Sequence, residues 1–156
     1  MHTVHLPPAG VTPEEGFFAS AMGLVFSVND YTADLTFAEQ QVIDIFFESM
    51  KWTVNGPTVD LVAYGSLMEM VDFNNRWVYK GSVTTPPCAR FVYWNVLSTI
   101  YPVSQTQLDN FKARLEEGTT GLRAAGNWRA IQPVNDHNVI YVQKGLATYL
   151  EEIAEG

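Results

Sequence analysis

The chain has 156 residues, of which 47% are hydrophobic, so it is long enough to bury a substantial core. Its formal net charge of −8, without a cluster of Lys and Arg, argues against binding to nucleic acid or to an anionic membrane surface. No hydrophobic run is long enough to span a membrane, and neither a Gly-x-Ser-x-Gly motif nor a glycine-rich phosphate loop is present.

The first predicted element is a strand at the N-terminus, Met1-His2-Thr3-Val4-His5. Side chains alternate along a strand, so His2 and Val4 share one face while His5 points to the other. His2 and His5 therefore cannot bind one metal ion together. Prolines and glycines in residues 7–16 predict a loop, and a second strand is expected at about residues 19–28.

Two helices are predicted from capping boxes. Thr36-x-x-Glu39 precedes apolar residues at helical spacing, so a helix is expected at about residues 37–50 with its apolar stripe in the core. The residues of this stripe are Val42, Ile45, Phe46 and Met50. Ser104-x-x-Gln107 predicts a second helix that continues to about residue 116.

Two further strands and a short helix complete the predicted elements. Residues 91–97 and 139–142 are rich in β-branched and aromatic side chains, which favours strands. Apolar residues at helical spacing predict a short amphipathic helix at about residues 144–154. This helix either docks on a partner or folds back on the sheet.

The segment Val83-Thr84-Thr85-Pro86-Pro87 places two hydroxyls directly before a proline pair. Proline restricts its own φ and favours an extended conformation in the residue before it, so both hydroxyls should be held in place. A held hydroxyl beside an exposed backbone N–H can orient a reacting oxygen and stabilise developing charge. Taken alone, the segment is better explained as a stiff connection from strand to loop.

This segment is part of a longer block, from Tyr79 to Cys88 with Trp94 six residues further, that resembles the active-site signature of the alpha-type carbonic anhydrases. Three other blocks resemble the same family in the same order. They are Met1–His5, Ala19–Val28 and the segment Asn127-Trp128-Arg129-Ala130-Ile131-Gln132-Pro133. The resemblance runs from His2 to about Tyr141.

The resemblance implies a mainly β (α+β) fold, with a large twisted, mixed and mostly antiparallel sheet and peripheral helices. The family binds zinc with three histidines, two of them in a His-x-His pair upstream of the strand that matches His2. This chain contains only His2, His5 and His137, and no such pair. Residues 1–156 are therefore expected to be the C-terminal part of a single domain, which by itself would leave a sheet edge and an apolar face uncovered.

The resemblance also implies roles for particular residues. His2 falls on a zinc-ligand position and Thr84 on the position of the catalytic threonine. Six residues fall on positions that line the substrate pocket: Val4, Ala21, Val83, Thr85, Val92 and Trp94. Four fall on supporting positions. A structural role is preferred for Asn127 and Arg129, which can bond backbone carbonyls and amides, and for Trp128, which can supply a large apolar contact. The supporting positions are His5, Tyr79, Asn127 and Arg129.

The implied activity is reversible hydration of carbon dioxide to bicarbonate. Zinc would lower the pKa of water to near neutrality, an effect for which carbonic anhydrases are the standard example, and hydroxide would attack carbon dioxide. Thr84 would accept the hydroxide proton in a hydrogen bond, and its backbone N–H would face the developing bicarbonate oxygen. One histidine ligand cannot build the site, so a longer chain or a second polypeptide would have to complete it. The alternative is a catalytically inactive subunit that binds a protein partner or takes a place in a larger assembly.

Cys88 is the only cysteine of the chain. In many secreted members of the family, a cysteine at this position pairs with one near the start of the domain, so the resemblance implies a disulfide to a partner outside this sequence. Such a disulfide would indicate a secreted, cell-surface or organelle-lumen location. A free or buried thiol is the equally weighted alternative.

Overall fold

The computed structural model describes residues 1–12, 17–54, 58–59, 61–118, 121, 126, 128–133 and 138–143. The chain forms two units. The first comprises Met1–Val25, Asp72–Thr99 and Arg129–Gly156, and the second comprises Phe26–Val71 and Ile100–Trp128.

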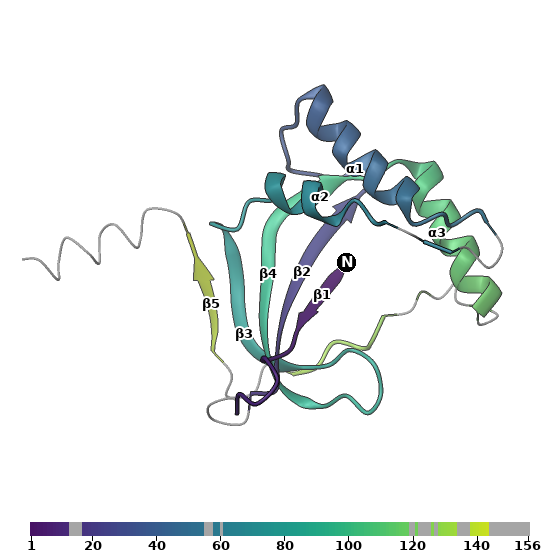
Figure 1. Cartoon of the computed structure of the whole chain (residues 1–156). Helices are drawn as coiled ribbons and strands as arrows, with labels where there is room; N and C mark the ends of the chain where they lie inside the picture. The colour runs from purple at the N-terminus through teal and green to yellow at the C-terminus, as the bar shows by residue number, and fades with distance from the viewer. Residues whose placement is uncertain are drawn as a thin grey trace, which may run out of the picture. The chain divides into compact units, whose positions relative to one another are not determined.

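A five-stranded sheet has the strand order β1-β2-β4-β3-β5 (Figure 1). Its strands are β1 (His2–His5), β2 (Ala19–Ser27), β3 (Arg76–Ser82), β4 (Arg90–Pro102) and β5 (Val139–Val142). β1 pairs antiparallel with β2, and β3 pairs antiparallel with both β4 and β5. Between β2 and β4 the contacts advance in the same direction along both strands. The Phe18 N–H donates to the Phe91 carbonyl, and the Val103 N–H to the Ser27 carbonyl. The sheet is therefore mixed, as expected.

The strand register determines which side chains share the face of the sheet that carries the candidate site. His2 lies opposite Gly23, and Val4 lies opposite Ala21. Tyr79 lies opposite Trp94, and Gly81 lies opposite Val92. Opposite residues of an antiparallel pair point to the same side, and every second residue of a strand returns to that side. We call this side the site face.

In the second unit, α1 (Phe37–Ser49) begins with the predicted capping box. The Thr36 hydroxyl accepts the Glu39 N–H, and the Glu39 carboxylate accepts the Thr36 N–H at 2.8 Å. The predicted stripe is confirmed at Phe46, which is buried together with Ile43, and was wrong at Ile45, which is 54% exposed. Ile43 and Phe46 lie three residues apart and share a face, whereas Ile45 projects from a different side of the helix.

The second predicted helix is also present, as α3 (Gln105–Gly118). The Ser104 hydroxyl accepts the Gln107 N–H at 3.1 Å, which supplies the expected cap. Phe111 of α3 contacts Trp52 edge-on, with ring centroids 5.4 Å apart. The described part of the chain contains no helix long and apolar enough to cross a membrane.

Two elements were not predicted. α2 (Tyr64–Met70) has seven residues and begins at Ala63 without a side-chain cap, so it carries no start signal. The sequence of β3 does carry a signal, because Trp77 and Tyr79 alternate with Val78 and Lys80 as in a strand. The four predicted strands are confirmed as β1, β2, β4 and β5, and β4 continues five residues further than the predicted end at residue 97. The helix predicted at residues 144–154 lies outside the described residues.

Candidate functional site

Trp94 is at the centre of the candidate site, with only 5% of its surface exposed. The ring of His2 meets it edge-on, with centroids 4.8 Å apart and planes at 73°. Tyr79 lies nearly parallel to the indole, with centroids 6.3 Å apart. The indole N–H donates to the Ser82 carbonyl at 3.1 Å. Trp94 is thereby held by contacts from β1 and β3.

An apolar wall surrounds this tryptophan on the site face. Ala21, Val92 and Trp94 form one buried cluster, against which Tyr79, Val83 and Val96 pack. Three of the predicted pocket residues thus form the wall itself, and Val83 joins it from the start of the following loop. Val4 shares the face but is 61% exposed and lies outside the cluster.

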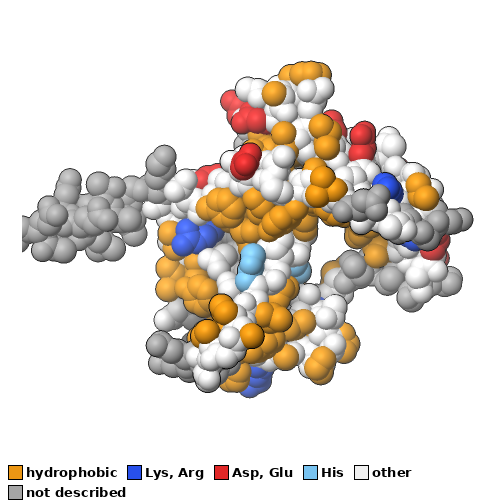
Figure 2. Space-filling view, in the orientation of Figure 1, with side chains coloured by type: hydrophobic (Ala, Val, Ile, Leu, Met, Phe, Trp, Pro, Cys, Tyr) orange, Lys and Arg blue, Asp and Glu red, His pale blue; other side chains and the backbone are white. Residues whose placement is uncertain are grey.

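His2 is exposed beside this wall, and histidine side chains are visible at the surface in Figure 2. Partial burial of the ring lowers the pKa of His2 below its ordinary value. The neutral imidazole, which can ligate a metal, is therefore favoured at neutral pH. His5 lies further along the same alternation, on the opposite face, where its Nε2 is 3.3 Å from the Thr3 hydroxyl. The register confirms that His2 and His5 point to opposite faces of the sheet.

Thr84 and Thr85 lie in a loop that is closed by two backbone hydrogen bonds. The Val83 N–H donates to the Ala89 carbonyl at 2.9 Å, and the Cys88 N–H donates to the Thr85 carbonyl at 2.8 Å. The Pro86–Pro87 peptide bond is cis, and Cys88 has a φ of 57°. Both threonine side chains are exposed, so their hydroxyls are available to a ligand. The Cys88 thiol is free and half-buried.

Arg129 ties the C-terminal segment to the start of this loop. Its Nη1 donates to the Ser82 hydroxyl at 2.6 Å and to the Val83 carbonyl at 3.2 Å. The predicted bond from Arg129 to a backbone carbonyl is confirmed. Trp128 is largely exposed, with 74% of its surface accessible. Asn127 lies outside the described residues.

Sequence reasoning missed two residues of this site, Gly81 and Ser82. A Cβ built on Gly81 would lie 2.7 Å from Trp94 Cδ1 and 2.9 Å from Tyr79 Cε2, so glycine is required by the close approach of these rings. Ser82 accepts hydrogen bonds through both its carbonyl and its hydroxyl. A glycine directly after the aromatic alternation of β3 was the available signal for such a close approach.

The described residues do not make a complete zinc site. No group of three or more His, Cys, Asp or Glu side chains that could hold a metal ion occurs among them. A catalytic zinc site normally has three protein ligands. His2 fits one of these positions, because its exposed, neutral ring stands beside the wall, but the other two would have to come from elsewhere.

The fold and these motifs agree with the comparison to known proteins. A family model described as eukaryotic-type carbonic anhydrase matches residues 20–143. The chain belongs to the eukaryotic-type carbonic anhydrase family. It is 31% identical over 90 residues to putative carbonic anhydrase 3 of Caenorhabditis elegans, a match that covers 56% of this chain and 36% of that protein. Human carbonic anhydrase 3 is 35% identical over 65 residues, covering 40% of this chain and 25% of the relative.

A third relative carries a different kind of name. The human carbonic anhydrase-related protein is 37% identical over 68 residues, covering 38% of this chain and 23% of that protein. The family thus includes carbonic anhydrases and a carbonic anhydrase-related protein among the relatives of this chain. The matched segments span little more than a third of these proteins at most.

Two solved structures share the fold. The alpha-carbonic anhydrase of Thermovibrio ammonificans, in complex with the inhibitor sulfanilamide, has a TM-score of 0.57 and 22% identity, covering 88% of this chain and 51% of that one. Dioscorin complexed with ascorbate has a TM-score of 0.51 and 22% identity, covering 80% of this chain and 48% of that one. The expected carbonic anhydrase fold is confirmed, and the chain spans about half of each structure.

Proposed function

We propose that this chain carries part of the active site of a zinc-dependent carbonic anhydrase, which interconverts carbon dioxide and bicarbonate once two further ligands complete the metal site. The observation that supports this most directly is that one sheet face brings His2 to Trp94, within the wall formed by Ala21 and Val92. These four residues come from three strands. They fall on the ligand and pocket positions of the family, and they meet in space.

The residues of the chain divide the work by chemistry. The apolar wall suits carbon dioxide, which is small and nonpolar and gains by leaving water. His2 provides one neutral imidazole, and zinc, when held by three ligands, would supply a Lewis acid that makes water a nucleophile near neutral pH. Thr84 presents a hydroxyl and a backbone N–H at the start of the closed loop, where they can orient and stabilise an oxygen of the substrate.

A second candidate function is a carbonic-anhydrase-like binding subunit without metal. It is favoured by one observation, the absence of a group of three metal-ligating side chains among the described residues. A fold does not guarantee the chemistry of its relatives. The two candidates differ in a measurable way, because only the first requires zinc.

The test is made on the protein purified from its natural source with any polypeptide that accompanies it. Intact mass, zinc content and the rate of carbon dioxide hydration are measured on the same sample. We expect a mass above 17.4 kDa or a second polypeptide, about one zinc per site and hydration that a chelator abolishes. A non-reduced mass that includes a cystine at Cys88 would support the proposed secreted, cell-surface or luminal location.

Two variants sharpen this test. His2→Ala should lower zinc affinity at least about tenfold, because even loss of a group that only orients a ligand costs that much. His5→Ala is the matched control, since His5 points to the opposite face of the same strand, and it should retain zinc. A preparation that is metal-free and inactive, with His2→Ala indistinguishable from the native protein, would favour the binding subunit.

A further inference from the structure

Arg129 donates two hydrogen bonds to the segment that leads into the Thr84 loop. From one nitrogen, Nη1, it reaches the hydroxyl of Ser82 and the carbonyl of Val83, the last residue of β3 and the residue after it. Arg129 is half-buried, so these hydrogen bonds are partly shielded from water. A hydrogen bond from a guanidinium is charge-assisted and stronger than one between neutral groups.

The carbonyl that Arg129 binds belongs to the same peptide unit as the Thr84 N–H. A peptide unit is planar, and in the trans form its C=O and N–H point in opposite directions. The Val83–Thr84 peptide bond is trans. Fixing the direction of the Val83 carbonyl therefore fixes the direction of the Thr84 N–H.

The neighbouring peptide unit is fixed as well. The Val83 N–H donates to the Ala89 carbonyl at 2.9 Å, which anchors the chain immediately before the Val83 carbonyl. A cation on the carbonyl also polarises the peptide unit and makes its N–H a better donor. Arg129 thus acts on both the aim and the strength of one backbone donor.

We propose that Arg129 is a positioning residue, which aims the Thr84 N–H at the oxygen that becomes negative in the reaction and strengthens it as a donor. This inference rests on the proposed function, in which that N–H faces the developing bicarbonate oxygen. Arg129 does not touch the substrate. It acts through the Val83–Thr84 peptide unit.

The first experiment observes the peptide unit directly and does not require activity. The protein as purified is labelled with 15N-threonine, and the amide resonance of Thr84 is followed in Arg129→Met. We expect this resonance to move, and Arg129→Lys to restore it in part, because lysine keeps the cation and loses the planar fork. Arg76→Met is the matched control. Arg76 also donates to a backbone carbonyl, that of Phe73 at 2.9 Å, and to Asn95, but at the other end of β3. It should leave the Thr84 resonance in place.

The second experiment measures catalysis by the complete zinc-loaded enzyme. Arg129→Met should lower kcat/KM by about tenfold to a hundredfold, which is at most the rate loss expected when one oxyanion-hole donor is removed. Most of this loss should be in kcat. Added guanidinium should restore part of the rate in Arg129→Met and none in Arg76→Met. If Arg129 had only a structural role, Arg129→Met would lower the stability of the protein and added guanidinium would not restore the rate.

The outcomes separate the two proposals. If the Thr84 resonance moves in Arg129→Met while the native protein has no hydration activity, the positioning role is supported and the proposed function is rejected. A Thr84 resonance that stays in place in Arg129→Met overturns the positioning role whatever the activity. Should Arg129→Met fail to fold, Ser82→Ala decides the question, because it removes one of the two acceptors of Arg129. It should displace the Thr84 resonance in the same direction as Arg129→Lys does, but by a smaller amount.

Discussion

Gly81 determines how closely the aromatic rings of the site can approach the sheet. A methyl group at this position would fall within 3 Å of both Trp94 and Tyr79, whose ring atoms cannot swing away as the end of a flexible side chain can. Trp94 is also tied by its indole N–H to the Ser82 carbonyl. The position of the tryptophan beside His2 therefore depends on a residue that has no side chain.

We predict that Gly81→Ala destabilises the protein by about 1–3 kcal/mol, the usual cost of overpacking, and displaces Trp94. Denaturant unfolding followed by tryptophan fluorescence would measure both effects. Gly65→Ala is the control, because a Cβ added to Gly65 would meet nothing within 4 Å and the residue sits inside α2. Helix propensity predicts that the control raises stability by roughly 0.5–1 kcal/mol. Equal stability of the two variants would contradict the close approach.

Among the helices and strands, α1 illustrates a start signal written entirely in the local sequence. The Thr36 hydroxyl and the Glu39 carboxylate satisfy each other's backbone N–H groups, so the helix begins at Phe37 without help from distant residues. We predict that Thr36→Ala costs about 1 kcal/mol of unfolding free energy, while Thr36→Ser, which keeps the hydroxyl, costs little. Thermal or denaturant unfolding distinguishes the pair, and an equal loss in both would show that the cap is not what stabilises this end.

The same cap gives a pH dependence with a definite sign. Hydrogen bonds from the Thr36 hydroxyl and backbone N–H lower the pKa of Glu39 in the folded chain. Its contribution to stability is thus complete above the ordinary glutamate pKa of about 4.3 and is lost as the pH falls through the lowered value. We predict that native protein and Glu39→Gln differ in stability at about pH 6 and converge as the pH falls through the lowered pKa of Glu39. Side-chain NMR titration of Glu39 should give a pKa below the ordinary value, and a raised pKa would contradict the cap.

The elements that were missed show where local signals end. α2 begins without a cap, and its seven residues are too few for periodicity to declare a helix. Ile45 was wrongly assigned to the core because Val42, Ile45, Phe46 and Met50 satisfy helical spacing as well as the face that is buried. Which of two overlapping faces is covered depends on what packs against the helix, and this information is not in the helix itself.

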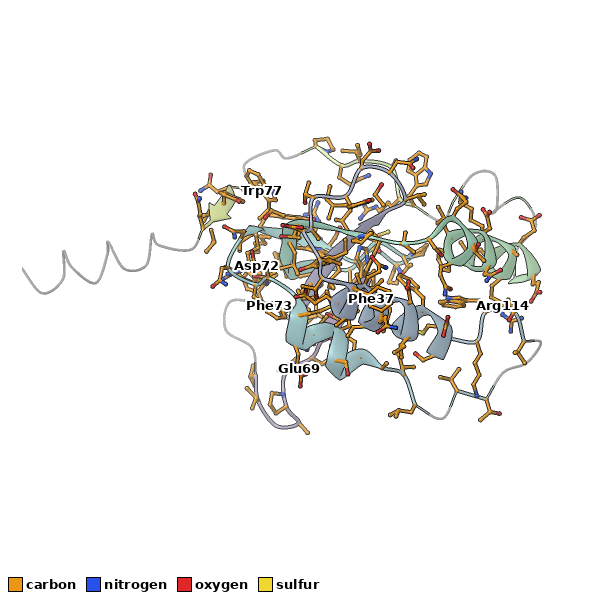
Figure 3. The ribbon with its side chains drawn as sticks, turned by 90° about the horizontal axis from the view of Figure 1, so that it is seen from above. Phe37, Glu69, Asp72, Phe73, Trp77 and Arg114 are labelled. Carbon is orange, nitrogen blue, oxygen red and sulfur yellow. The ribbon has the colours of Figure 1, made fainter. Side chains whose placement is uncertain are left out.

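At the scale of the whole molecule, an aromatic pair of β3 and β5 forms part of an exposed apolar surface. Trp77 and Tyr141 bring their ring centroids to 4.4 Å, yet they remain 45% and 38% exposed (Figure 3 labels Trp77). Val139 is exposed on the same face of β5. Contiguous exposed apolar side chains of this kind mark surfaces that normally contact something else.

We predict that the isolated 156-residue chain self-associates at micromolar concentration through this surface, and that Trp77→Lys reduces the association. Light scattering after size-exclusion chromatography gives the mass of the species, and binding of an apolar dye reports the exposed surface. Phe37→Lys is the control, because Phe37 is an exposed aromatic residue at the start of α1 and belongs to the other unit of the chain. A native chain that is monomeric and melts cooperatively would refute this prediction.

Features that depend on near neighbours could be recognised from the order of amino acids alone. Strand alternation separated His2 from His5, capping boxes located the starts of α1 and α3, and the Thr-Thr-Pro-Pro block with its flanking residues identified the family. Short-range sterics and local hydrogen bonds decide such features, so they can be recognised within a few residues.

Contacts between distant segments became known only from the folded chain. The contact of His2 with Trp94, the close approach of Trp94 to Gly81 and the bond from Arg129 to the Val83 carbonyl all join residues from different segments of the chain. They follow from strand order and register, and a shift of one residue in register would turn every side chain of a strand to the other face. Register is set by the packing of the whole sheet, and no single segment of this chain contains it.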